Sequence, residues 1–194
     1  MKKNKENRVK LESNDKLTLL VREKDIEYWE DLLIFIRDLP YGRNTNREDL
    51  GLVMKELRGT CSSKHAFLKE IADRNEIKNI KLILGIYKMN ENNTPKIENT
   101  LSKVGIKYIP EAHCYLKIKN IVVDLTMIES NFEKIKDDVI KEIEINADDV
   151  GEFKVEFHKN YLKKWIEKEN MKLYFEEIWK QREKCIRKLE EKLK

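Results

Sequence analysis

Three residues of the sequence have side chains that could together carry out acyl chemistry: Cys61, His113 and Asp124. Nucleophilic catalysis by cysteine needs a sulfur held as the thiolate, a base within hydrogen-bonding reach, and a third group that orients the base. Thr60 can cap a helix that begins at Cys61, and the free N–H groups at a helix N-terminus favour a negatively charged sulfur. These residues predict a triad with Cys61 as nucleophile, His113 as base and Asp124 as the orienting acid.

The segment around Cys61 predicts a largely buried helix whose first turn opens onto a cleft. Gly59 and Thr60 break the preceding helix. Beyond them, Leu68 and Ala72 share a helical face with Cys61. A thiol in the first turn of such a helix lies at a break in the chain, where a substrate could reach it.

Two alternating segments, HCYLKI (113–118) and IVVDLT (121–126), predict a β-hairpin with a two-residue turn between them. In that register His113 and Asp124 are diagonal neighbours on one face of the sheet. Diagonal neighbours lie ~7–8 Å apart, a gap that a histidine ring and a carboxylate can close. Asp124 is thus predicted to hold one ring nitrogen of His113 while the other nitrogen faces Cys61.

The remaining periodicities predict an α+β fold, because helical stripes and short apolar or alternating runs occur in turn along the chain. Several segments begin at a residue that could cap a helix, such as Asn46 and Thr94. Helices are expected over residues 26–36, 47–57 and 95–104 and from 158 to the end, and strands over 80–87, 139–145 and 152–157 (EFKVEF).

The chain of 194 residues is long enough for one domain with its own core. The polar residues 1–16 are expected to be poorly ordered. Residues 17–150 are expected to form the catalytic core, and residues 151–194 a helical extension packed on it. The helices of this extension are amphipathic, so docking of a protein partner, or self-association, is the alternative to packing on the core.

Charge and hydropathy limit the partners. The net charge is +4, the basic residues near both ends are interleaved with glutamate, and the segment that carries the candidate triad is mildly acidic, which disfavours a nucleic-acid groove. No apolar run approaches the ~18–20 residues that span a bilayer, and no apolar leader follows the basic N-terminus. Three cysteines, an odd number, argue against a disulfide framework. We therefore expect a cytoplasmic protein without nucleic-acid or membrane partners.

The stretch GTCSSKHAFLKEIADRNEI (59–77) is similar to the cysteine motif of the transglutaminase-like superfamily. In that motif a Gly-x-Cys enters a helix that carries an alanine five residues after the cysteine, followed by an apolar run and then a strand. Gly59, Cys61, Ala66 and Leu68 match it in order. The cysteine of the motif is the family's nucleophile, which is the role that the resemblance implies for Cys61.

HCYLKI and IVVDLT resemble the strands that carry the family's histidine and aspartate. His113 and Asp124 stand at the matching positions, and Thr126 completes the usual D-x-T. The resemblance covers residues 55–127. It implies a papain-like core, with an antiparallel sheet packed on the cysteine-bearing helix, and acyl transfer through a cysteine thioester with water or an amine as the acceptor.

The resemblance also implies an oxyanion hole formed by the backbone N–H of the cysteine and an upstream donor. Tyr41, Asn44 and Asn46 in the PYGRNTN loop are the candidates for that donor. Ser62 and Ser63 replace an acid that family members often carry soon after the cysteine, a departure that bears on the substrate class.

These observations predict a cysteine-dependent hydrolase or acyltransferase that acts on an amide or thioester and needs no cofactor. The substrate would be a peptide, a protein or a small amide or thioester. The first alternative is a non-enzymatic binding or assembly protein that retains the fold and engages a partner through its C-terminal helices.

The second alternative is a metal-binding domain. Cys61-x3-His65 together with His113 and Cys114 offers four soft or borderline ligands. Adjacent strand residues point to opposite faces, however, which opposes a closed tetrahedral site, so no metal is expected. His65 itself lies one turn after Cys61 and could contact the thiolate or the substrate, or lie as a polar residue at the edge of the cleft.

Overall fold

The computed structural model describes residues 8–191, and the expected α+β class is confirmed. The helices of this range are α1 (Lys16–Arg22), α2 (Trp29–Asp38), α3 (Leu52–Lys55), α4 (Cys61–Arg74), α5 (Glu152–Lys168) and α6 (Phe175–Glu191). The strands are β1 (Ile80–Met89), β2 (Ile109–Ile118), β3 (Ile121–Val123) and β4 (Val139–Ile145). Short 3-10 turns are η1 (Pro95–Ile97), η2 (Ser102–Val104), η3 (Phe132–Lys134), η4 (Lys136–Asp138) and η5 (Ala147–Val150). Within residues 8–191 none of the helices has the length and apolar character needed to cross a membrane.

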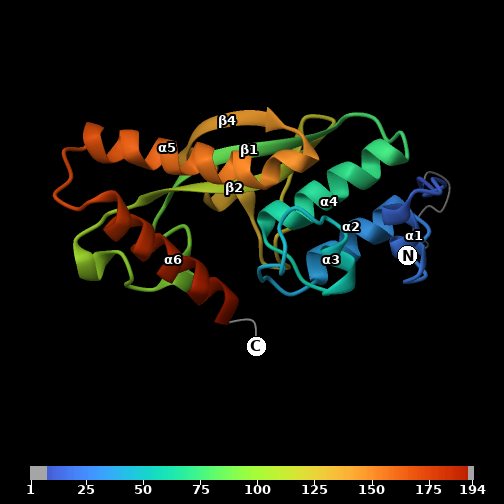
Figure 1. The fold of residues 1–194 in the computed structure, drawn as a ribbon, viewed down its shortest axis with the longest axis horizontal. Helices are drawn as coiled ribbons and strands as arrows, with labels where there is room; N and C mark the ends of the chain where they lie inside the picture. The colour runs from blue at the N-terminus through green and yellow to red at the C-terminus, as the bar shows by residue number, and fades with distance from the viewer. Residues whose placement is uncertain (1–7, 192–194) are drawn as a thin grey trace.

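The sheet has the order β3-β2-β1-β4, and all of its neighbouring strands are antiparallel. Helix α4 packs against β1 and β2, and α5 also packs against β2. Figure 1 shows α1, α2 and α3 gathered beside α4 at one end of the molecule, with α6 toward the other end. Strand β2 therefore contacts helices from both halves of the chain.

The hairpin of β2 and β3 was predicted correctly. Its turn is formed by Lys119 and Asn120, with φ angles of 50° and 67°, the left-handed values that two-residue turns of this kind require. The ladder runs from Ile118 paired with Ile121 to Leu116 paired with Val123. Asp124 follows directly after the last pair.

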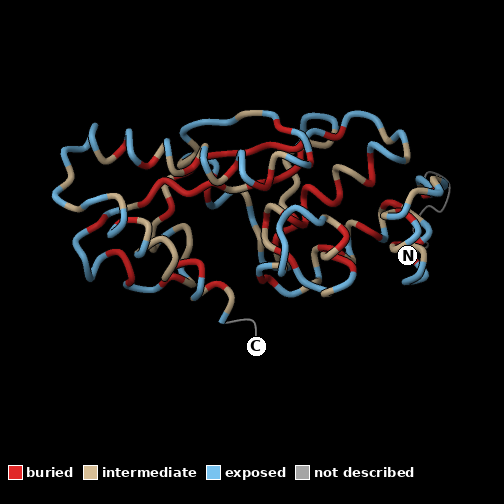
Figure 2. Tube along the Cα trace, viewed as in Figure 1, coloured by how far each residue is buried: buried red, intermediate tan, exposed pale blue. Residues whose placement is uncertain are grey.

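The apolar interior is divided into two clusters. The first joins α1 to α4 with one part of the sheet and includes Leu32, Phe67 and Leu82. The second joins the 3-10 turns after β1 with α5 and α6 and includes Leu101 and Ile178. Figure 2 shows buried chain running along the central strands and the inner sides of the helices. The C-terminal helices thus form part of the interior, and their apolar stripe is buried within the chain itself.

The helix expected over 47–57 is reduced to α3, and the N-cap expected at Asn46 is absent. The side-chain oxygen of Asn46 accepts the N–H of Glu48 at 3.0 Å, and that of Asp49 accepts the N–H of Gly51 at 2.9 Å. These local side-chain bonds hold the backbone in turns and so compete with helix formation.

The helix expected over 95–104 is replaced by the two turns η1 and η2. Glu98, between them, has a φ of 52°, which lies outside the right-handed helical region. Gly105 ends η2 with a left-handed φ of 71°, a conformation that glycine adopts readily at the end of a helical turn.

The strand expected over 152–157 is wrong, because these residues form the first turns of α5. The buried face of α5 is Lys154, His158, Leu162 and Trp165, which follows a helical spacing. The first two residues of this buried face, Lys154 and His158, are polar, so a hydropathy pattern does not show the helical period. The apolar residues Phe153, Val155 and Phe157, which are exposed or half-buried, alternate with polar residues as they would in a strand.

The poor order expected for residues 1–16 does not apply to residues 8–16. Leu11 is 1% exposed, and its N–H donates to the carbonyl of Glu27 at 2.8 Å. The N–H of Trp29 donates to the carbonyl of Val9, also at 2.8 Å. These contacts hold the segment against the start of α2, while residues 1–7 lie outside the described residues.

Candidate active site

The first turn of α4 is fixed by its cap. Thr60 is the N-cap: its Oγ1 accepts the N–H of Ser63 at 3.4 Å, and its own N–H donates to Ser63 Oγ at 2.9 Å. A Cβ on Gly59 would lie 2.8 Å from Lys64 Cγ and 2.9 Å from Ser63 Oγ, too close for any larger residue. Cys61 is consequently the first residue of α4, with 8% of its surface exposed.

The loop that carries Tyr41 is held beside this turn by backbone hydrogen bonds. The N–H of Gly59 donates to the carbonyl of Pro40 at 3.1 Å, and the N–H of Gly42 donates to the carbonyl of Gly59 at 3.2 Å. As a result Tyr41 lies next to Cys61 and lines the cavities on both sides of it.

His113 and Asp124 are brought together by the hairpin. Nε2 of His113 lies 2.8 Å from Oδ2 of Asp124. The other oxygen of Asp124 accepts the N–H of Thr126 at 3.0 Å and its hydroxyl at 2.6 Å. Burial alone would raise the pKa of Asp124, but the charge of His113 and the hydrogen bonds from His113 and Thr126 hold it well below its usual range. Asp124 is therefore an ionised, fully satisfied acceptor.

The sulfur of Cys61 interacts with His113 and with a lysine from α5. Burial opposes ionisation of the thiol, but the charge of Lys154, followed by the charge and a hydrogen bond of His113, lowers the pKa of Cys61 from about 9 to about 6. In turn, the charges of Asp124 and Cys61 outweigh burial and raise the pKa of His113 well above its usual value. Because Nε2 bonds Asp124, Nδ1 is the ring nitrogen left for Cys61, and the two pKa shifts favour a thiolate paired with an imidazolium.

His65 is completely buried, so it does not lie at the edge of the cleft. It does not hydrogen-bond the sulfur of Cys61, because both of its ring nitrogens are engaged by backbone groups. Its Nε2 accepts the N–H of Leu125 at 2.8 Å, so the ring proton is on Nδ1, which donates to the carbonyl of Cys61 at 2.7 Å. Burial lowers the pKa of His65 to about 4. His65 thus connects the backbone at the nucleophile to the backbone beside Asp124.

Lys64, which the sequence analysis did not single out, also joins separate segments of the backbone. It is completely buried, and its ammonium donates to the carbonyls of Leu39 at 2.5 Å and Thr126 at 2.7 Å and more weakly to that of Arg37 at 3.4 Å. Burial lowers its pKa to about 8. Lys64 and His65 together hold two segments, residues 37–39 and 125–126, against the first turn of α4.

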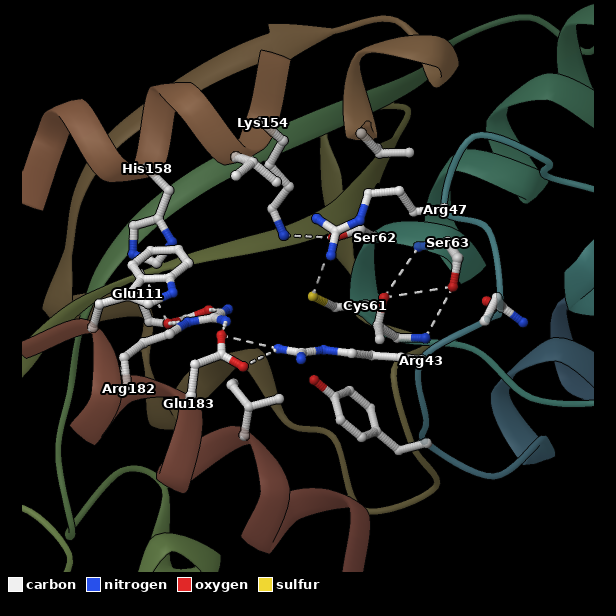
Figure 3. A pocket seen from close by; sticks show the side chains of 17 residues that line it. Arg43, Arg47, Cys61, Ser62, Ser63, Glu111, Lys154, His158, Arg182 and Glu183 are labelled. Atoms are coloured by element: carbon white, nitrogen blue, oxygen red, sulfur yellow. Dashed lines mark hydrogen bonds and ion pairs between the residues drawn. The ribbon is translucent and has the colours of Figure 1, made fainter. Parts of the chain in front are cut away.

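Two cavities meet at Cys61. The first, of about 320 Å³, is polar and receives Arg43, Arg47, Lys154 and Arg182 (Figure 3). The second, of about 210 Å³, lies on the side of His113 and Asp124 and is lined mainly by apolar groups such as Met89, Met127, Ile135 and Leu189. Tyr41, Cys61, Glu111 and Ile186 line both. A substrate chain laid across Cys61 would therefore contact a cationic wall on one side and an apolar wall on the other.

The upstream candidates for an oxyanion donor differ in what they can supply. Asn44 lines the first cavity, but its amide N–H groups donate to Glu56 Oε2 and to the carbonyl of Arg58, each at 3.0 Å. Asn46 is exposed, lines neither cavity and is engaged in its own turn. Burial, and then the charge of Cys61, raises the pKa of Tyr41 well above its usual value, so its hydroxyl keeps its proton and remains a donor.

The sequence analysis missed the contribution of the C-terminal helices to the site. Lys154 and His158 come from α5, and Arg182 and Glu183 from α6. Arg182 stands within the apolar stripe of the last helix, and a charged residue in such a stripe is a signal for a buried ion pair. In the structure this pair is with Glu111 of β2, at 2.8 and 2.5 Å.

No cluster of three or more histidine, cysteine or acidic residues that could hold a metal ion occurs in the described part of the chain. His65 has both ring nitrogens engaged, so it offers no lone pair to a metal.

Comparisons with protein-family models, with curated proteins and with solved structures returned no match to this chain. What the site can do is therefore inferred from its own geometry: a thiolate beside an imidazolium that a buried carboxylate orients, open on two sides.

Proposed function

We propose that this chain is a transglutaminase-like cysteine hydrolase or acyltransferase that acts on an amide or thioester. The observation that carries the proposal is the arrangement of Cys61, His113 and Asp124: a Nε2–Oδ2 distance of 2.8 Å and a thiol pKa of about 6. The order of the elements, a cysteine at the start of a buried helix followed by an antiparallel sheet with the histidine and aspartate on its hairpin, supports the family.

In the proposed reaction the thiolate of Cys61 attacks the acyl carbon, and the carbonyl electrons move onto its oxygen. When that oxyanion collapses, the bond to the leaving group breaks, and Nδ1 of His113 gives its proton to the departing amine or thiol. The acyl group is then a thioester on Cys61. Water or an amine attacks it, His113 takes the proton of the acceptor, and the thiolate returns. Asp124 remains ionised throughout and keeps the ring in place.

The oxyanion would lie at the positive end of α4. The N–H of Cys61 belongs to the first turn, whose amides have no carbonyl partner within the helix. Tyr41 supplies the second donor in this proposal, since its hydroxyl is neutral and it lines the cavities on both sides of Cys61. Donors of this kind, preorganised where charge develops, are worth roughly 10²–10³ in rate.

The proposal is tested by the reactivity of Cys61. We expect iodoacetamide to alkylate Cys61 with a half-maximal rate near pH 6, in line with its pKa. p-Nitrophenyl acetate should leave an acetyl group on Cys61, detected by mass spectrometry, and Cys61→Ala is the control for site. Cys114 and Cys185 are completely buried and should react slowly. Alkylation with the pH profile of a free thiol, near about 8.5, would overturn the proposal.

A further inference from the structure

The first cavity holds more positive charge than its own carboxylates neutralise. Its four cationic side chains are Arg43, Arg47, Lys154 and Arg182, and its two carboxylates are Glu111 and Glu183. Glu111 is bound by Arg182 through both oxygens, at 2.5 and 2.8 Å. Glu183 bridges Arg182, at 2.6 Å, and Arg43, at 2.8 Å. Both carboxylates are therefore engaged by the two arginines.

Lys154 and Arg47 have no such partner. Lys154 is only 9% exposed, yet among the described residues its ammonium has one hydrogen bond, to the neutral hydroxyl of Ser62, and an ammonium has three N–H groups to donate. Arg47 is exposed but lines the cavity, and within residues 8–191 no side-chain hydrogen bond or ion pair engages it. Burial, together with the charges of Arg43 and Arg182, lowers its pKa.

Both cations enter the same cavity. In Figure 3 the side chains of Lys154 and Arg47 point into it from different sides, and Lys154 donates to Ser62 Oγ. Ser62 Oγ lies 3.8 Å from Cys61 Sγ. An acceptor group bound to the ammonium of Lys154 would thus lie within about one residue of an acyl carbon on the sulfur, given the ~3.8 Å step between residues of a chain.

The net charge of the first cavity indicates the charge of the ligand that it would bind. The cavity has two positive charges beyond its carboxylates, and the thiolate of Cys61 offsets one of them. His113 and Asp124 neutralise each other on the far side of the sulfur. One negative charge then completes the cavity, whereas a dianion would be repelled by Glu111 and Glu183.

We infer that this cavity binds a carboxylate of the substrate, held between Lys154 and Arg47, so that the acyl donor is an acidic peptide or another carboxylate-bearing amide or thioester. The inference rests on the proposed function, because it assigns the substrate class of the same site. It also completes the reaction cycle: when Cys61 becomes a thioester its negative charge disappears, and the substrate carboxylate remains as the counter-ion of Lys154.

The inference is tested with a pair of alkylating agents of similar size. Iodoacetate carries a carboxylate and iodoacetamide a neutral amide, and with each the sulfur forms a bond to carbon while iodide leaves. We expect the ratio of the iodoacetate rate to the iodoacetamide rate at Cys61 to exceed the ratio for a small free thiol by about tenfold, the lower end of the effect of a cleft of one charge sign. Raising the ionic strength should reduce it.

Charge reversal at Arg47 identifies the source of this preference. Arg47→Glu should lower the ratio by about tenfold, and Arg47→Gln by less, because the neutral residue removes attraction without adding repulsion. Arg187→Gln, on an exposed arginine of α6, removes the same charge outside the cavity and should leave the ratio unchanged.

The outcomes separate the two proposals. If iodoacetamide alkylates Cys61 with the rate and pH profile of a free thiol, the proposed function fails, and this inference fails with it. If iodoacetamide shows the shifted profile but the ratio equals that of a free thiol, or does not respond to Arg47→Glu, the carboxylate site is overturned and the proposed function stands. A general charge effect is excluded when the ratio responds to the Arg47 variants and not to Arg187→Gln.

Discussion

The two walls of the cleft both stabilise a negative sulfur, but they come from different parts of the chain and act differently. On one wall His113 and Asp124, from the β2–β3 hairpin, offer an imidazolium that can give and take a proton. On the other wall Lys154, from α5, acts on Cys61 through its charge. The comparison shows a division between the two cations: both lower the pKa of the thiol, but only His113 has a proton that it could give and take near neutral pH.

The walls also differ in what they present to a ligand. The cavity beside His113 is lined mainly by apolar side chains, whereas the cavity beside Lys154 is lined by arginines and lysine. A substrate with one acidic and one apolar group flanking the reacting bond would satisfy both. In the proposed function, charge on one side and apolar contact on the other would orient a substrate across Cys61.

The largest effect is expected when the histidine wall is broken. His113→Ala should lower acetylation of Cys61 by p-nitrophenyl acetate by roughly 10²–10⁴-fold, because the group that transfers the proton is lost. The pKa of Cys61 should also rise, since one of the two cations that lower it is gone. Stopped-flow release of nitrophenolate measures the rate. A loss of less than about tenfold would show that His113 is not the base.

An intermediate effect is expected from Lys154→Met, which keeps the length of the side chain but removes its charge. The pKa of Cys61 should rise by about one unit, so alkylation by iodoacetamide near pH 6 should slow by about fivefold. Well above the new pKa the rates of variant and wild type should converge, because the thiolate is then complete in both. Lys164→Met, at an exposed position of the same helix, is the matched control. Slowing that persists equally at high pH would mean that Lys154 acts through packing and not through charge.

The smallest effect on the chemistry, and a clear one on stability, is expected from His65→Gln, since His65 joins the two backbones without touching substrate. The pKa of His65 is about 4 in the folded chain against about 6.5 when unfolded. Between these values the unfolded chain binds more protons, so the free energy of unfolding falls as pH decreases from 6.5 to 4. The shift corresponds to roughly 3 kcal/mol.

Glutamine can donate and accept in place of the ring, yet it does not titrate. Denaturant unfolding at pH 6.5 and at pH 4 should therefore show a smaller difference for His65→Gln than for the wild type. The alkylation rate of Cys61 at neutral pH should change little. An equal pH dependence in both proteins would contradict a neutral, buried His65.

Local patterns were sufficient where the deciding interactions are close in sequence. The start of α4 follows from Thr60 and Cys61, because a cap bonds to backbone two or three residues away. The β2–β3 turn follows from Lys119 and Asn120, because two residues between alternating segments leave few alternatives. The proximity of His113 and Asp124 follows from that turn, so the hydrogen bond between them required no knowledge of the rest of the fold.

Patterns misled where the deciding contacts are distant. Residues 152–157 alternate in hydropathy like a strand, but α5 forms because Lys154 and His158 face the interior. Both are buried only because distant groups accept them: Ser62 for Lys154, and the carbonyl of Pro110, at 2.7 Å, for His158. A polar residue looks exposed in a hydropathy profile until its buried partner is known.

Residue types and their spacing are enough to identify the candidate nucleophile, base and acid, and the helix and hairpin that present them. The surroundings of the sulfur depend on the folded chain: the placement of Lys154 beside it, the fixed tautomer of His65, and the meeting of a cationic and an apolar cavity at Cys61. The difference comes from the separation along the chain between the groups that interact. Capping and turn formation are settled within a few residues, whereas charge and burial around Cys61 depend on side chains that lie some ninety residues away in the chain, as Ser62 and Lys154 do.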